Sequence, residues 1–519
     1  MTGTFPVPSG PEPGAEPRAG RDPEEVVAHS LGGAKWMLWL SASALAFGFG
    51  TNVVLGRSAP ELLGFYGFLT LTVSLVSVFF VLGGTNVLVN YLPKQAHGEK
   101  VPFLLAYTGI VLLAALVFLG LAAAFPGLLD LVFGEAAESS ALGYLALFVP
   151  LGVLQTLAWS ALQADLDLRV LAVSHQVVSS LNFVVLAVAG VAGWLDGPLT
   201  GSRRVVLLSM VTANTVSLAI AVWGLWTRQL RRWDRVAGLS LPSGFWRFSL
   251  FFHASTIVQF AVRSLDQVYV LRQLGFAALG YYRGALVLAQ LGNFLLVVTD
   301  RAFYSTFCNV EAAAQPTLYR RFVRLNSVGT SIAGLVLLTF SQELLQLFGE
   351  SATSQSQSLL LLLASGILLA FPITSVNNSL VTARERINVI FANNVAGAIA
   401  AVVLYAWLGT DHGILGVGWA FLALQLFILV LSTGAVRRAA AVSFPLKAWI
   451  VSILAVGLGV GAATLLEGTS APEIALKAGV LAAFVPLLLL LRLVTRDELE
   501  DLVALVVPGR WFARAGAAT

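Results

Sequence analysis

The sequence predicts an all-α polytopic membrane protein with about 14 transmembrane helices. Hydrophobic residues make up 57% of the 519 residues, and the mean hydropathy is +0.84. Only 11% of the residues are charged, whereas soluble domains carry about 25%. Apolar runs of about 20 residues, the length that crosses the hydrocarbon core as a helix, follow one another with short polar breaks.

Apolar segments account for most of the chain. The predicted spans cover residues 36–56, 62–91, 102–125, 141–163, 171–194, 205–226, 249–271, 277–304, 324–347, 357–381, 388–408, 413–434, 448–466 and 473–494. Each can cross about 30 Å of hydrocarbon as an α-helix. Because the number of spans is even, both termini are expected on the same side of the membrane.

Lysine and arginine indicate which side that is. Most of the 31 basic side chains fall in the N-terminal tail and in alternate connections, including the basic connection at 228–235 between the sixth and seventh spans. The opposite side receives only Arg57, Arg203, Arg204, Arg272 and Lys477. Cytoplasmic connections carry the excess of Lys and Arg, so both termini are predicted to be cytoplasmic.

Two similar segments indicate an internal repeat. Leu63-Gly64-Phe65-Tyr66 opens one span, and Leu279-Gly280-Tyr281-Tyr282 opens another 216 residues later. This interval fits two halves of about six helices each, a common plan for transporters. The predicted organisation is a disordered cytoplasmic tail (1–28), an N-terminal six-helix bundle (29–240), a C-terminal six-helix bundle (241–440), two extra transmembrane helices (441–495) and a cytoplasmic interfacial tail (496–519).

Charged side chains in the seventh and eighth spans mark the candidate site. They are Arg263, Asp266, Arg283, Asp300 and Arg301. One charge at the bilayer centre costs at least about 2.5–3.5 kcal/mol on insertion scales, so this cluster predicts a wet or protein-lined interior. Arg263 and Asp266 are three residues apart and share a helix face, so they can pair, and such a pair can also serve only to neutralise two buried charges.

The eighth span carries the other three charges of this cluster. Arg283 lies close to the start of its span and can snorkel to the interface. Asp300 and Arg301 point about 100° apart, and we expect Asp300 to face the interior as a salt-bridge partner or protonation site. Gln290 follows Arg283 by two turns and shares its face. The predicted polar lining also includes Gln259, Asn293 and Tyr282.

Amide side chains recur in the remaining spans. Most are expected to form hydrogen bonds between helices, and some to line a cavity. They include Gln155, Gln163, Asn182, Asn214, Asn377, Asn378, Asn388, Asn393 and Asn394.

Several classes of function lack support in the sequence. The single cysteine, Cys308, excludes an intramolecular disulfide framework, and the five histidines, His175 and His253 among them, offer no paired ligand at helical spacing for a metal. The basic residues are interpreted as a topology signal, so no nucleic-acid partner is expected. There is no Gly-x-x-x-x-Gly-Lys-Ser/Thr loop and no long loop for a catalytic domain, so neither an enzyme nor a cofactor is predicted.

The motifs resemble, in order and spacing, the polysaccharide transporter branch of the multidrug/oligosaccharidyl-lipid/polysaccharide (MOP) exporter superfamily, which includes O-antigen-type flippases. The resemblance covers about residues 30 to 495 and rests on the two Leu-Gly-x-Tyr segments, Gly83-Gly84, Asp266, Ala285 and Gly413-Ile-Leu-Gly416-Val-Gly418. It implies two six-helix bundles around a central V-shaped cavity that work by alternating access. Many family members concentrate positive charge in the first bundle, whereas the first-bundle spans of this chain are nearly uncharged.

The resemblance also implies a transported substrate and a cellular location. It implies an undecaprenyl-diphosphate-linked oligosaccharide that is moved to the outer leaflet of a bacterial inner membrane, with membrane lipids and other polysaccharide-assembly membrane proteins as partners. A diphosphate in a low-dielectric interior needs cations that keep their protons, and Arg263 and Arg283 are the predicted ligands. Alternatives are a drug/cation antiporter of the same superfamily, which would need cavity carboxylates, a lipid II flippase, a membrane-embedded polysaccharide polymerase, and a non-transporting scaffold of an exopolysaccharide complex.

Overall fold

The computed structural model describes residues 42–81, 87–88, 91–92, 95, 99–125, 141–164, 167–228, 241, 245–292, 303, 307, 313–384, 386–466, 468, 470–496 and 498–500. In these ranges all regular secondary structure is helical. Ten of the described helices are long and apolar enough to cross a membrane. The predicted tail 1–28 lies outside the described residues, as does most of the predicted tail 496–519.

The helices follow the predicted spans. The first covers residues 42–58. After it come α2 (Pro60–Phe80), α4 (Lys100–Ala124), α6 (Ala141–Ala164), α7 (Leu168–Val191), α8 (Leu199–Arg228), α9 (Phe245–Leu291), α11 (Gln315–Thr339), α12 (Ser341–Gln346), α13 (Glu350–Ala383), α14 (Ile387–Ala440), α15 (Leu446–Leu465) and α16 (Ala471–Leu490). The predicted span 324–347 included the residues of α12, which the structure separates from α11 at Phe340 as a short helix of its own.

Short local signals fix where several helices begin. Proline, which needs no hydrogen bond for its nitrogen, stands at the first position of α2 and in the first turn of α11 and α16. Ser470 and Glu473 form a reciprocal capping box at the start of α16. The Asp167 side chain accepts a hydrogen bond from the backbone N–H of Val170 and caps α7.

α9 consists of two antiparallel helices joined at Gly275. This residue has φ 82° and ψ −173°, in the positive-φ region that favours glycine. The Tyr282 hydroxyl, seven residues after the turn, donates a 2.5 Å hydrogen bond to Asp266 Oδ2, nine residues before it. In a straight helix the two residues would lie about 24 Å apart. The arms of this hairpin, residues 245–274 and 276–291, correspond to the seventh and eighth predicted spans.

α14 is a second hairpin of the same kind. It turns at Gly413, with φ 58° and ψ −137°. The Asn393 side-chain amide donates to the carbonyl oxygen of Leu431 at 3.3 Å, which brings the two arms side by side. Its arms correspond to the eleventh and twelfth predicted spans. When each hairpin is counted as two helices, the structure confirms the predicted fold class of about 14 membrane helices.

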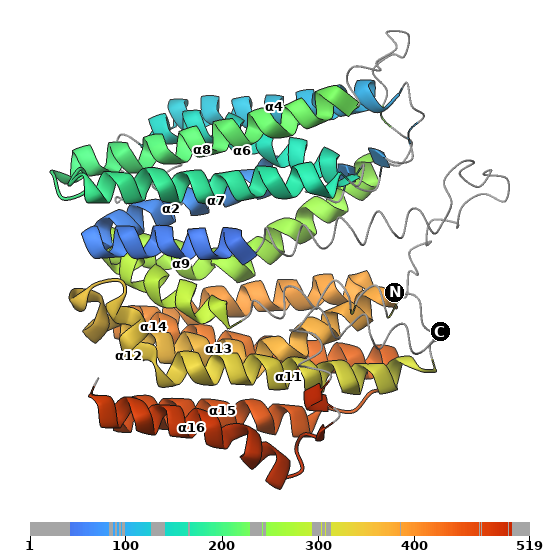
Figure 1. Cartoon of the computed structure of the whole chain (residues 1–519). Coiled ribbons are helices and arrows are strands. Elements are labelled where there is room, and N and C mark those ends of the chain that lie inside the picture. Colours follow the sequence, from blue (N-terminus) through green and yellow to red (C-terminus); the bar gives the residue numbers. More distant parts are fainter. Residues whose placement is uncertain are drawn as a thin grey trace.

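The helices form two bundles with a final pair attached to the second (Figure 1). In the first half α2, α4, α6, α7 and α8 contact one another, and in the second half α9, α11, α13 and α14 do the same. α15 packs along α11, and α16 contacts both of them. The extensive contact between the two bundles is that of α2 with α9. This contact therefore positions any site between the halves.

A pair of buried hydrogen bonds reveals the repeat inside the bundles. In the first bundle, the Gln155 amide on α6 donates to the Ser217 hydroxyl on α8 at 3.0 Å. In the second, the Asn377 amide on α13 donates to the Ser432 hydroxyl in the second arm of α14, also at 3.0 Å. Each bond joins the fourth helix of a bundle to the sixth. The expected interhelical hydrogen bonds of these two amides are thus confirmed.

Candidate functional site

α2 and the second arm of α9 cross through two equivalent glycines. A Cβ atom on Gly64 would overlap the carbonyl oxygen of Phe276, and a Cβ on Gly280 would overlap that of Pro60. Gly64 lies four residues after Pro60, and Gly280 lies four residues after Phe276. The two glycines are 216 residues apart, as are Pro60 and Phe276. The crossing is therefore a local two-fold axis between the bundles. Because Pro60 and Gly275 lie beside it, we call this end of the molecule the Gly275 end.

Arg283 fills the space that Gly67 leaves open on α2. These residues are also 216 apart, so one repeat carries an arginine where the other carries no side chain. A Cβ at Gly67 would lie 2.9 Å from Arg283 Cδ. The guanidinium carbon lies 5.1 Å from the centre of the Tyr66 ring, and Arg283 Nε donates to Asn52 Oδ1 at 3.1 Å. A cation of the second bundle is thus held by the first.

The groups that hold Arg283 are themselves fixed by hydrogen bonds. The Asn182 amide on α7 donates to the Tyr66 hydroxyl at 3.1 Å, and its oxygen accepts from the Ser209 hydroxyl on α8. Asn52 donates to the carbonyl oxygen of Gly48 at 2.6 Å. Asn52 and Tyr66 were not among the predicted site residues. The signal that could have found Tyr66 is its place at the end of the repeated Leu-Gly-x-Tyr segment, two residues after the crossing glycine Gly64.

Aromatic rings seal the crossing on the side of α8. The ring of Phe276 lies edge-on to those of Phe65 and Phe68, with centroids 6.1 Å and 5.8 Å apart. The Arg203 guanidinium lies over both Phe65 and Phe276, 5.5 Å and 5.1 Å from their centroids. A basic side chain that the sequence assigned to topology thus also contacts both bundles through cation–π interactions.

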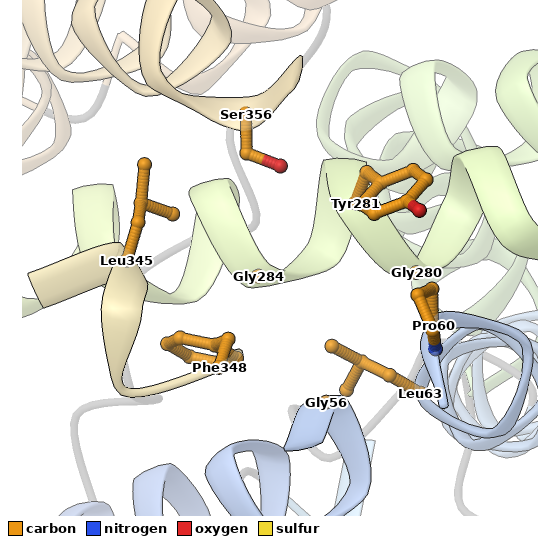
Figure 2. Close-up of a pocket in the computed structure, with 9 residues that line it drawn as sticks. All are labelled: Gly56, Pro60, Leu63, Gly280, Tyr281, Gly284, Leu345, Phe348 and Ser356. Atoms are coloured by element: carbon orange, nitrogen blue, oxygen red, sulfur yellow. The ribbon is translucent and has the colours of Figure 1, made fainter. Parts of the chain in front are cut away.

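The connection between α11 and α13 closes the opposite side. Arg57 Nε, at the end of the first helix, donates to the carbonyl oxygen of Leu347 at 2.8 Å. Phe348 and Leu63 face one another across a crevice between the bundles, shown in Figure 2. The crevice has a volume of about 10 Å³, which is room for about one water molecule. We call this crevice between the packed surfaces of the two bundles the seam. It is too small to accept a substrate.

Asp266 joins the two arms of α9. Its side chain is buried, with Oδ2 accepting from Tyr282 and Oδ1 accepting from the backbone N–H of Gln267 at 2.8 Å. Tyr405 of α14 is also fully buried, and its ring stacks on that of Tyr269, with centroids 6.4 Å apart. The carboxylate is therefore buried between the two arms of the hairpin in the second bundle.

The helices that cross at the Gly275 end separate further along. On α2, Leu63 and Gly67 are buried, Thr70 is half-buried and Ser74 is exposed, although all four lie on one face. The second arm of α9 repeats the pattern, because Gln290 is exposed on the face of Leu279 and Arg283. Ser74 and Gln290 are again 216 residues apart. The facing surfaces of the two bundles are thus buried at the Gly275 end and exposed beyond it, and we call the exposed region between them the cleft.

The first arm of α9 contributes charged and polar groups to this open region. Val270 and Asp266 are buried, whereas Arg263 and Gln259, further from the turn on the same stripe, are exposed. The exposed residues near the start of α9, Trp246 and Leu250, lie on the opposite face of the helix. Arg263 and Gln259 are therefore exposed on a second, inner surface.

Solved structures resemble this arrangement. One described as the lipid II flippase MurJ in an inward closed conformation aligns over 87% of this chain and 98% of that chain, with a TM-score of 0.64 and 13% identity. An inward-facing multidrug resistance MATE family transporter of the MOP superfamily aligns over 77% and 95%, with a TM-score of 0.60 and 12% identity. A MOP superfamily transporter from Pyrococcus furiosus aligns over 85% and 97%, with a TM-score of 0.51 and 14% identity.

This protein shares the fold of these solved transporters. No family model and no curated protein matches the chain. Identities this low establish the fold alone.

The fold brings some of the predicted site residues together and separates others. Asp266 and Tyr282 touch inside the second bundle, Arg283 reaches the first bundle, and Arg263, Gln259 and Gln290 are exposed along the cleft. Arg263 and Asp266 therefore differ in burial despite their spacing. Asn293, Asp300 and Arg301 lie outside the described residues. Within the described ranges, no group of three or more His, Cys, Asp or Glu side chains could hold a metal ion.

Proposed function

We propose that this protein is a flippase that moves an undecaprenyl-diphosphate-linked oligosaccharide from the inner to the outer leaflet by alternating access, for polysaccharide biosynthesis. Its place is the bacterial cytoplasmic (inner) membrane, with both termini cytoplasmic. The observation that carries the proposal is the one-sided closure of the bundles, with Arg263 exposed in the cleft beyond the seal. A cation in such a cleft suits a cargo whose phosphates must leave water.

The charges at the two ends support this orientation. The ends of α11, α13 and α14 that lie away from the Gly275 end carry most of the arginines of the second bundle, namely Arg320, Arg321, Arg324, Arg384, Arg437 and Arg438. Basic residues favour the cytoplasmic side, so the cleft opens to the cytoplasm and the Gly275 end faces outward. The structure then corresponds to the state that receives cargo from the inner leaflet.

The two arginines take different parts in this cycle. Arg263 is exposed in the open cleft, where it binds the diphosphate, with Gln259 and Gln290 as exposed polar residues along the same cleft. Arg283 is engaged by Asn52 and Tyr66 and becomes available when the seal at the Gly275 end opens. We further propose that Asn293, Asp300 and Arg301 extend the polar lining of the cleft. Bidentate donors and a permanent charge make arginine the suitable residue for both steps.

A cation-coupled multidrug antiporter is the second candidate, and one observation favours it. Asp266 is a buried carboxylate in the second bundle, and a transporter can couple to a cation or proton through such a group. It is held by Tyr282 and by the backbone rather than exposed to the cleft, which supports a role in joining the hairpin arms. A lipid II cargo is an alternative within the flippase proposal.

Deleting the gene in its own host tests the proposal against these alternatives. The surface polysaccharide, the inner-leaflet lipid-linked oligosaccharide and the sensitivity to cationic compounds are measured together, after complementation with wild type, Arg263→Ala or Arg263→Lys. The flippase proposal predicts accumulation of glycolipid inside and failure of Arg263→Ala at normal membrane levels. Unchanged polymer with increased sensitivity to cations replaces it with the antiporter. Accumulation of lipid II identifies the other cargo.

A further inference from the structure

A histidine and a tryptophan form a stacked pair on two helices of the first bundle. The rings of His175 on α7 and Trp159 on α6 have centroids 3.7 Å apart and an angle of 23° between their planes. The Trp159 indole N–H donates to the Ser174 hydroxyl at 2.6 Å. Ser174 and Ser217 hydroxyls are 2.8 Å apart, and Ser217 accepts from Gln155. A buried polar network thus fixes the plane of the stack.

His175 is exposed on the inner side of α7. The residues of α7 that are exposed along its outer stripe are Val173, Val184, Val188 and Val191. His175 lies on the opposite face, together with Asn182 and Leu186, both of which are buried. The same inner face is therefore closed at the level of Asn182 and open at the level of His175. This is the change in exposure that Ser74 and Gln290 show across the cleft.

The position of His175 along the cleft matches that of the exposed polar residues of α9. Asn182 contacts Tyr66, which lies beneath Arg283, so these three residues share one level. His175 is seven residues from Asn182, or about 10 Å further from the Gly275 end. From Arg283 the same shift of about 10 Å reaches Gln290, and Arg263 lies about 4 Å closer to the seal than His175.

We propose that the His175–Trp159 stack is a platform for a sugar ring of the lipid-linked oligosaccharide, next to the diphosphate bound by Arg263. This inference rests on the proposed function and deepens it. Sugar rings present faces of C–H groups to flat aromatic surfaces and hydroxyl groups at their edges, which an imidazole edge can meet by hydrogen bonding. Along the cleft, Arg263 and His175 differ in level by only about 4 Å, so a sugar attached to the diphosphate lies at the level of the stack.

Binding to the purified full-length protein in nanodiscs tests the platform. Two probes are compared by native mass spectrometry: undecaprenyl diphosphate, and undecaprenyl diphosphate carrying the oligosaccharide of the host. Wild type is expected to bind the sugar-bearing probe about 2- to 10-fold more tightly, in line with the strength of one aromatic stack. His175→Ala abolishes this preference and leaves the affinity for undecaprenyl diphosphate unchanged, His175→Phe retains the preference, and Arg263→Ala weakens both probes.

The control is Trp223→Ala, which removes an exposed aromatic ring from α8 outside the stack and should change neither affinity. If His175→Ala keeps the full preference for the sugar-bearing probe, or lowers both affinities equally, the platform is overturned. Equal binding of the two probes by wild type also overturns it while leaving the flippase proposal intact. If wild type binds neither probe, the proposed function fails and the inference fails with it.

Discussion

Gly64 and Gly280 close one end of the molecule reciprocally. Each lies where any Cβ atom would overlap a backbone carbonyl oxygen of the other helix, those of Phe276 and Pro60 respectively. The contact is the same from both sides because the two glycines are 216 residues apart in a repeated segment. A seal built from backbone surfaces of two equivalent helices can close and open as a unit, which is what alternating access requires.

Replacing either glycine should prevent the seal. Gly64→Ala or Gly280→Ala inserts a methyl group between two backbones, and overpacking of this kind costs about 1–3 kcal/mol, or roughly 5- to 150-fold in the population of the closed seam. Maleimide labelling of Ser356→Cys, a residue buried in the seam, measures the opening in a chain with Cys308→Ser. Labelling should speed up by at least about fivefold on this estimate.

Gly48→Ala is the matched control, because nothing lies within 4 Å of a Cβ added to Gly48. It should leave the labelling rate of Ser356→Cys unchanged. Equal labelling rates in the Gly64→Ala and wild-type backgrounds would show that the bundles do not meet through these glycines.

The bond between Arg283 and Asn52 should stabilise the closed seam. A hydrogen bond to a charged group contributes about 1.5–3 kcal/mol, so Asn52→Ala should weaken the seam by roughly 10- to 100-fold. The same labelling assay, applied to Asn52→Ala, Arg283→Ala and the double variant, forms a double-mutant cycle. The two effects should be non-additive, with the double variant close to the worse single variant. Additive effects would place the two side chains in separate interactions.

The last helix is joined to the seam region by a buried ion pair. Lys477 on α16 is 1% exposed, and its Nζ lies 2.6 Å from Glu343 Oε1 on α12. Lys477→Met leaves the Glu343 charge without its partner and should destabilise the protein by about 3–5 kcal/mol. Thermal unfolding in detergent measures the change, and Arg438→Met at an exposed position is the control. The double variant Lys477→Met with Glu343→Gln should recover much of the loss, and a double variant as unstable as Lys477→Met would argue against the pair.

Asp266 should matter for structure more than for cation coupling. Tyr282→Phe removes the hydroxyl that donates to the buried carboxylate, which should cost about 1–3 kcal/mol in thermal stability. Asp266→Asn keeps an acceptor for Tyr282 and should retain both fold and glycolipid transport. Stability and transport are measured for the same preparations. Loss of transport in a stably folded Asp266→Asn protein would instead assign this residue to coupling.

The sequence predicts the membrane-spanning helices of this fold. Apolar runs separated by polar breaks predict each span, and the repeated Leu-Gly-x-Tyr segments mark the helices that cross. The sequence does not predict that Gly64 and Gly280 touch, since reciprocity is a property of two helices in space. It also cannot identify Asn52 as the partner of Arg283, because an amide in an apolar span has many possible partners and this one lies 231 residues away.

Arg263 and Asp266 lie on one stripe of α9, as their spacing predicts, but they differ in burial. Residues three apart point within about 60° of one another, so a shared face is a fair expectation. Spacing along a helix does not predict the change in exposure along α9, which buries Asp266 near the turn and exposes Arg263 one turn further away. Only the crossing at the Gly275 end, formed by residues far apart in the chain, determines where that change occurs.

Flipping by the purified protein tests the central claim most directly. The protein is reconstituted into liposomes that contain undecaprenyl-diphosphate-linked oligosaccharide, and the fraction that becomes accessible to an external lectin is followed with time. Wild type should translocate the glycolipid, and Arg263→Ala should slow this by roughly 10- to 100-fold through the loss of one charged contact to the diphosphate. Wild-type liposomes that expose glycolipid no faster than protein-free liposomes would contradict the account.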